Sequence, residues 1–224
     1  MLKDIANETE QKLDDIMHSS LSVESINFKC NGCGACCKNR GDIFLSPLDI
    51  YYICRYLNIS LNTFMDTYVV KDSILLYIKD KGDPEKTCAF YGTQIGCMIH
   101  PVKPKTCYMF PFLELDDNKF RVQLIPCVLE NNPFISNKTI KEILINNSCR
   151  YEPEKEILNK YLLLFNEFFE KIYEYFQKGI DTKPAENFFF DTFFSNIDLK
   201  LDENKFLEWF QEQIVVAEDA LIMM

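Results

Sequence analysis

Four cysteines near the start of the chain are spaced so that their sulfurs could meet at one metal centre. They are Cys30, Cys33, Cys36 and Cys37, in the pattern Cys-x-x-Cys-x-x-Cys-Cys. Gaps of two residues let a tight turn direct successive sulfurs at one point, and Gly32 and Gly34 allow the close approach of backbone to ligand that such a turn needs. The pattern therefore predicts a bound metal ion or an iron–sulfur cluster.

Further cysteines are needed to complete the ligand set. The candidates are Cys88, Cys97, Cys107 and Cys127. With the first group they suffice for one four-thiolate site with spare cysteines, or for two such sites. Adjacent side chains diverge in most turn geometries, so we expect one of Cys36 and Cys37 to face a second site. Two other cysteines, Cys54 and Cys149, lie away from the motif and are predicted to be structural.

The ligand set favours iron over zinc. The run from Cys30 to Cys36 matches the opening of a bacterial ferredoxin motif, although no fourth cysteine follows after three residues. Zinc ribbons pair two separated C-x₂-C knuckles, and a second knuckle is missing here. The prediction is an iron–sulfur cluster, preferably 4Fe-4S, with zinc as the alternative. His100 could join a zinc site, but a turn histidine bonded to backbone is the simpler interpretation.

Two lysines lie beside the downstream cysteines. Lys103 and Lys105 stand in a stretch between Cys97 and Pro111 that three prolines stiffen, so Cys107 is presented with little conformational freedom to lose. Because thiolates concentrate negative charge, we expect both lysines to offset that charge and to contribute to cofactor binding.

The arrangement of cysteines resembles a known family. The matching parts are Cys30–Cys37, Cys88, Cys97 and the box Lys103-Pro104-x-x-Cys107-x-x-Phe110-Pro111. Over roughly residues 28–130 the chain resembles the CxxCxxCC family of zinc- or iron-chelating domains. Flagellin lysine-N-methylases carry a related pattern and are linked to an iron–sulfur cluster. This chain departs from the family at Lys103, where an Arg is expected, and Lys would grip an anion less well than a bidentate Arg.

Composition excludes several classes of function. The net charge is −10 and cations are not clustered, so nucleic-acid binding is not expected. No apolar stretch is long enough to span a membrane, and the acidic N-terminus does not look like a signal peptide. With only two histidines, the chain has little to build a histidine-based hydrolase from. We expect a cytoplasmic protein, in which ten cysteines stay reduced and bind metal.

Helix caps and hydrophobic periodicity predict the elements that position the cysteines. Helices are predicted over 3–21, from Ser46 to about Leu57, from Ser60 to about Tyr68, from Thr139 for two turns, and over 154–178 and 202–220. The non-helical predictions are a loop over 28–42, a strand over 74–79, a hairpin around Gly92–Gly96, and extended segments 108–115 and 119–124.

These elements predict an α+β fold, in which a cysteine-rich loop and small β-hairpins are wrapped by α-helices and the last third is helical. We expect residues 1–224 to form a single compact domain, with the cysteine core over about 28–150 and a helical part over 151–224. The aromatic run from Phe188 to Phe194 is predicted to belong to the core, with a dimer or partner groove as the alternative.

Three functions remain open at this level. The first is a metal or iron–sulfur protein for redox chemistry, metal handling or maturation. The second, which the resemblance implies, is a cluster-dependent enzyme that methylates lysines of a protein substrate, although no methyl-donor site is recognisable. The third is a zinc-stabilised module that binds a protein partner. Catalytic residues and the oligomeric state are not assigned.

Overall fold

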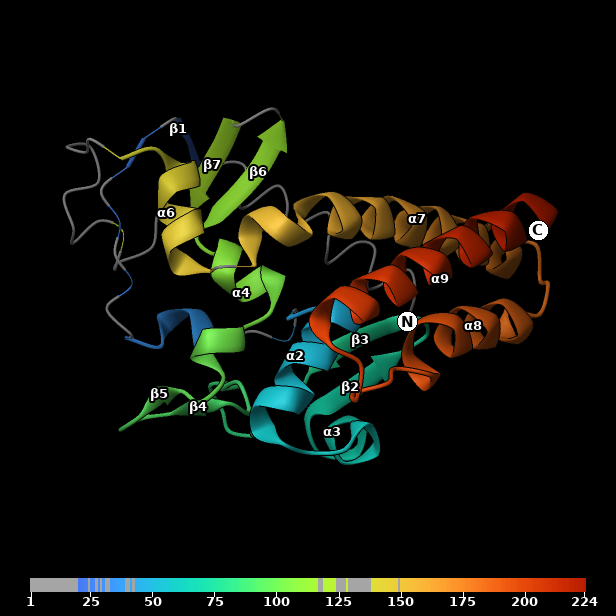
Figure 1. The fold of residues 1–224 in the computed structure, drawn as a ribbon, viewed down its shortest axis with the longest axis horizontal. Coiled ribbons are helices and arrows are strands. Elements are labelled where there is room, and N and C mark those ends of the chain that lie inside the picture. The colour runs from blue at the N-terminus through green and yellow to red at the C-terminus, as the bar shows by residue number, and fades with distance from the viewer. Residues whose placement is uncertain are drawn as a thin grey trace.

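Helices and short antiparallel strands alternate through the first two thirds of the chain, and long helices make up the last third (Figure 1). The predicted α+β fold class is confirmed. The structure is a computed structural model, and the residues that it describes are 20–23, 25–26, 28, 30, 33–38, 41, 43–116, 119–123, 128, 138–148 and 150–224.

The described strands form three antiparallel sheets. The first has the order β1-β7-β6 and the others are the pairs β2-β3 and β4-β5. The strands are β1 (Ser20–Val23), β2 (Val69–Asp72), β3 (Leu75–Ile78), β4 (Tyr91–Gly92), β5 (Gly96–Cys97), β6 (Phe112–Asp116) and β7 (Lys119–Gln123).

The helical elements connect these sheets and then continue without strands to the C-terminus. The α-helices are α2 (Pro47–Leu57), α3 (Leu61–Tyr68), α4 (Lys105–Met109), α6 (Ile140–Asn147), α7 (Tyr151–Gln177), α8 (Lys183–Phe190) and α9 (Glu203–Met223). The short turns are the 3₁₀ segments η1 (Ala35–Cys37) and η2 (His100–Val102), and the π-helical segment η3 (Asp191–Ser195). None of the described helices is long and apolar enough to cross a membrane.

Local signals in the sequence set the predicted helix starts. Ser46 caps α2: its hydroxyl accepts from the Asp49 N–H at 3.2 Å, and Asp49 Oδ2 accepts from the Ser46 N–H at 3.0 Å. Thr139 and Glu142 form the same box at the start of α6, and Asp202 caps α9. The predicted starts are confirmed. They could be predicted because each cap involves residues within three positions of one another.

Several other elements differ from the predictions or were not predicted. The predicted helix over 3–21 lies mostly outside the described residues, but Ser20 and Leu21 belong to β1, where Leu21 pairs with Val122. Strand β2 was not predicted, and it forms by pairing Val69 with Ile78 of β3. Tyr108 is in α4 rather than in an extended segment, and β6 begins only at Phe112.

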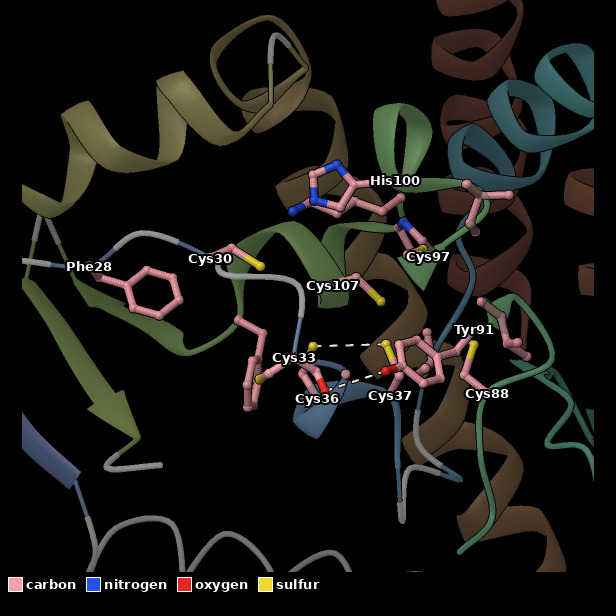
Figure 2. Close-up of a pocket in the computed structure, with 17 residues that line it drawn as sticks. Phe28, Cys30, Cys33, Cys36, Cys37, Cys88, Tyr91, Cys97, His100 and Cys107 are labelled. Atoms are coloured by element: carbon pink, nitrogen blue, oxygen red, sulfur yellow. Dashed lines mark hydrogen bonds between the residues drawn. The ribbon is translucent and has the colours of Figure 1, made fainter. Parts of the chain in front are cut away.

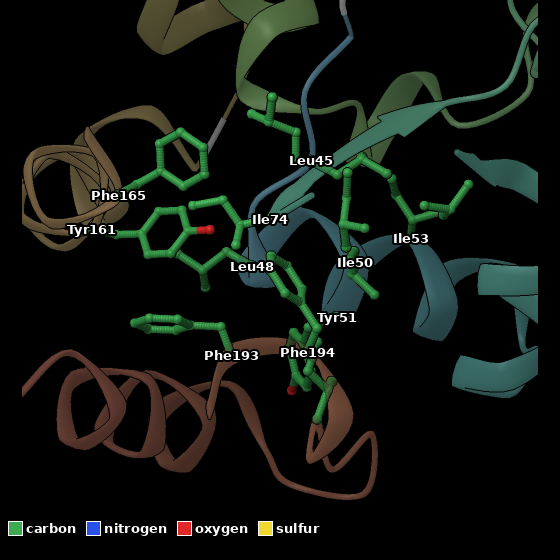
Figure 3. Close-up of a cluster of buried hydrophobic side chains, with 14 of the residues drawn as sticks. Leu45, Leu48, Ile50, Tyr51, Ile53, Ile74, Tyr161, Phe165, Phe193 and Phe194 are labelled. Atoms are coloured by element: carbon green, nitrogen blue, oxygen red, sulfur yellow. The ribbon is translucent and has the colours of Figure 1, made fainter. Parts of the chain in front are cut away.

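Two groups of buried side chains hold the fold together. The larger core lies between α2, β3 and the C-terminal helices, as Figure 3 shows. Its members include Leu45, Leu48, Ile53, Cys54, Ile74, Tyr161, Phe165, Phe193 and Phe194. The smaller core lies under β6 and β7, against α4 and α6. Its members include Ile26, Tyr108, Phe112, Phe120, Val122, Ile140 and Tyr151.

The aromatic run of α8 and η3 belongs to the larger core. The rings of Phe189 and Phe193 are buried, and the Phe193 ring meets that of Tyr161 edge-on at 5.1 Å between centroids. This confirms the prediction that the run is core. Helix α8, which carries part of it, had not been predicted.

Cys54 is a core residue, as its apolar neighbours predicted. Its side chain is 0 % exposed, and burial raises the pKa of its thiol to about 12. The thiol therefore stays protonated at neutral pH, and only the thiolate is a nucleophile or a metal ligand.

We predict that Cys54→Ala leaves metal content unchanged and costs about 1 kcal/mol of stability, as a small core truncation does. In the folded metal-free protein, iodoacetamide near neutral pH should alkylate the exposed Cys30 and leave Cys54 unmodified. Peptide mass spectrometry measures both. Loss of metal in Cys54→Ala, or equal alkylation of the two thiols, would contradict the assignment.

Candidate metal centre

Seven of the predicted cysteine ligands line one pocket (Figure 2). They are Cys30, Cys33, Cys36, Cys37, Cys88, Cys97 and Cys107. They come from the N-terminal loop, from the β4–β5 hairpin and the residues before it, and from α4. The cavity has a volume of about 90 Å³, and Phe28, Tyr91 and Phe110 form part of its wall. The eighth predicted ligand, Cys127, lies outside the described residues, as does Cys149.

In its described residues, the N-terminal loop forms a short turn and a backbone bond to a distant segment. Gly34 has φ 76°, and its carbonyl accepts from the Cys37 N–H at 2.9 Å, which closes the turn η1. The Cys37 carbonyl then accepts from the Cys88 N–H at 2.7 Å. This bond joins two cysteine-bearing segments that are far apart in the sequence.

Tyr91 of β4 packs directly on this loop. Its hydroxyl donates to the Cys33 carbonyl at 3.4 Å, and a Cβ placed on Gly34 would lie 2.2 Å from the Tyr91 ring. The requirement for glycine at position 34 is thus twofold, because the backbone is left-handed and the ring leaves no room for a side chain. Tyr91 was not predicted as a site residue, since this contact joins residues distant in sequence and leaves no local signal.

The sulfurs of Cys36 and Cys37 converge. They are 4.0 Å apart, so the expectation that adjacent cysteines diverge was wrong. Both residues lie in the short turn η1. In a tetrahedral site with metal–sulfur bonds near 2.3 Å, ligating sulfurs lie about 3.8 Å apart. The separation of this pair therefore suits two ligands of one metal atom.

The crowding of thiols opposes their ionisation. A hydrogen bond with Cys36, burial, and the proximity of Cys88 and Cys97 all raise the pKa of Cys37. Burial likewise raises the pKa of Cys97. A metal cation that binds here must displace these protons, and in return it supplies the positive charge that lets the sulfurs ionise.

The seven sulfurs line a cavity, and they are not grouped at the spacing that a single metal ion requires. In the part of the chain that the structure describes, no three histidine, cysteine, aspartate or glutamate side chains are grouped closely enough to hold one metal ion. Only a guest larger than one ion, or closure of the pocket around a single ion, would let three or more of the sulfurs bind together.

The residues from η2 to α4 supply one side of the pocket. His100 and Lys103 line it together with Cys107, which lies in the first turn of α4 (Figure 2). Burial and the nearby Lys103 ammonium lower the pKa of His100, so its imidazole is neutral and able to ligate a metal at neutral pH. Lys105 lies outside the lining: its ammonium donates to Asn159 Oδ1 at 3.1 Å, and burial lowers its pKa.

A family model covers this region. The CxxCxxCC model, whose description reads "putative zinc- or iron-chelating domain", matches residues 29–150. The chain belongs to this family. No solved structure matches the chain. The CxxCxxCC domain contains every cysteine of the pocket and ends just before α7 begins at Tyr151, and the flagellin lysine-N-methylases are not part of the match.

We predict that Gly34→Ala weakens metal binding by about 10- to 100-fold, the range typical when the support of a ligand is disturbed. The new Cβ would push on the Tyr91 ring and shift the Cys33 and Cys37 backbone. Gly179→Ala is the matched control, because Gly179 has φ 70° and open space around it, so it tests backbone strain alone. Chelator competition measures both variants, and equal affinities in the two would contradict the prediction.

Proposed function

We propose that this CxxCxxCC protein binds its zinc or iron as a thiolate-ligated centre in the pocket of Figure 2. The observation that carries the proposal is the convergence of seven cysteines from separate segments on one cavity. Structural thiols have no need to converge, and thiolates gathered in one pocket without a cation would repel one another. A cytoplasmic location would keep these thiols reduced and available.

The shape of the pocket favours a guest with more than one metal atom. A single tetrahedral ion draws its ligands to about 2.3 Å and needs four of them. Here seven thiols surround a cavity of about 90 Å³, and no three described side chains that could ligate are grouped at single-ion spacing. An iron–sulfur cluster fits this arrangement better than one zinc ion. When bound, such a cluster supplies electron transfer.

The Cys36–Cys37 pair distinguishes between types of cluster. In a 4Fe-4S cluster each of the four cysteines binds its own iron, whereas in a 2Fe-2S cluster two cysteines share each iron. Sulfurs 4.0 Å apart fit the shared iron. In a 4Fe-4S centre, the two sulfurs would have to move apart for both to ligate, each to its own iron.

Neighbouring side chains have supporting roles in this proposal. The rings of Phe28, Tyr91 and Phe110 exclude water from one side of the cavity. Lys103 offers a positive charge at the wall, which offsets the negative charge of the thiolates. Lys105 does not line the pocket. Its ammonium donates to Asn159 of α7 and so links α4 to that helix.

Protein purified without oxygen should be brown and should contain iron and acid-labile sulfide. Metal analysis and absorption spectroscopy measure this, and electron paramagnetic resonance of the reduced protein separates two-iron from four-iron clusters. A colourless protein with stoichiometric zinc would overturn the cluster and leave thiolate chelation intact. Protein that takes up neither metal would overturn the proposed function itself.

Cys36→Ser and Cys37→Ser should each remove the centre, and the double variant should be no worse than either single one. Two ligands of one metal atom are coupled, so their losses are not additive. Metal content and the thiolate-to-metal absorption bands are the measurements, with Cys54→Ala as the control. A single variant that retains the full metal content and absorption would show that its cysteine is not a ligand.

A further inference from the structure

Arg150 is buried beside the metal pocket without being part of its lining. It directly precedes α7, and its side chain is only 4 % exposed. The guanidinium lies over the ring of Tyr52 at 4.1 Å, and its Nε donates to both carboxylate oxygens of Glu154, at 2.8 and 3.1 Å. A buried arginine held on two sides in this way has a defined orientation, so its remaining donors point in fixed directions.

Those remaining donors reach the segment that carries pocket residues. Arg150 Nη1 donates to the carbonyls of Val102 and Lys103, each at 3.4 Å. Val102 ends η2 and Lys103 follows it, in the backbone that leads to α4 and Cys107. The arginine thus fixes, from outside the cavity, the backbone that forms one wall of the pocket.

Asp49 completes the support. Its Oδ1 accepts from Arg150 Nη2 at 3.1 Å and from the Lys105 N–H at 3.2 Å. Lys105 is the first residue of α4, and Cys107 follows in the same turn. Asp49 Oδ2 is meanwhile bonded to the N–H and hydroxyl of Ser46, at 3.0 and 2.7 Å, so the carboxylate cannot turn away. One carboxylate therefore ties the start of α4 to the start of α2.

We propose that Arg150 and Asp49 are positioning residues for the metal centre, which orient the 102–107 segment so that Cys107 faces the other cysteines. The proposal rests on the proposed function. Neither side chain lines the cavity, so both act through the backbone of that segment. Arginine is required because only its planar fork can meet a carboxylate on each side and two carbonyls at once, whereas the single ammonium of lysine cannot.

Arg150→Lys is the first test, because it keeps the charge and loses the fork. The probe is Co²⁺ added anaerobically to the full-length, metal-free protein, with chelator competition and visible absorption as readouts. We expect the affinity for Co²⁺ to fall by about 10- to 100-fold, as is typical when the partners that orient a ligand are changed. The matched control is Lys160→Gln, which removes an exposed ion pair with Glu156 within α7 and should leave the affinity unchanged.

A double-variant comparison separates positioning from general stability. If Arg150 acts through Cys107, Arg150→Lys should weaken Co²⁺ binding in the wild-type background and should have no further effect in Cys107→Ser. An equal fall in both backgrounds would overturn the proposal, because a merely structural role lowers affinity regardless of Cys107. Urea unfolding of the metal-free variants shows which fraction is folded at the start.

Asp49→Asn is the second variant, for use if Arg150→Lys does not fold. It keeps the size of the side chain and removes the negative charge of the carboxylate, whose Oδ1 accepts from both Arg150 Nη2 and the Lys105 N–H. The same loss of affinity, again absent in Cys107→Ser, would support the proposal, and unchanged affinity would overturn it. Wild-type protein that takes up neither Co²⁺ nor iron with sulfide under anaerobic conditions would instead count against the proposed function.

Discussion

Thiols gathered in one pocket cannot all ionise unless a cation lies among them, and the rest of this structure depends on that constraint. The hydrogen bond with Cys36, burial and the neighbouring sulfurs raise the pKa of Cys37, so in the metal-free state this thiol stays protonated. Metal binding replaces those protons, and its free energy becomes part of the free energy of folding. This energy can help to hold the N-terminal loop, whose described residues include the short turn η1.

The pocket lies where the two hydrophobic cores meet. Phe28, which lines it, stacks edge-on against Phe112 of the smaller core, with ring centroids 5.5 Å apart. Tyr91 and Ile99, which also line it, belong to the larger core. A centre bound to cysteines on both sides would therefore join the cores as well as the chain segments. Helices α7 and α9 pack side by side and both contribute side chains to the larger core (Figure 1).

What could be predicted from the sequence was local. The cap at Ser46 and the box at Thr139 involve neighbours in the chain, and the Cys-x-x-Cys spacing directly reflects the geometry of a turn. Strand β1 could not be predicted, because it exists only through its pairing with β7. The contact of Tyr91 with the Cys33–Gly34 backbone was likewise not predictable, because Tyr91 lies 58 residues from Cys33 along the chain. In each case the deciding partner lies far along the chain.

Asp49 shows why a site can depend on residues that its motif does not contain. In the sequence it looks like an ordinary member of a capping box, and that local role is real. Its second oxygen, however, binds Arg150, which lies a hundred and one residues further on. A buried ion pair is weak support for stability, because the cost of removing two charges from water offsets most of their attraction. What the pair does provide is a fixed orientation of the backbone, because it ties the 102–105 segment to α2 and α7. Correct placement of the ligands matters more to a metal centre than added stability does, since a ligand misplaced by a fraction of an ångström binds poorly.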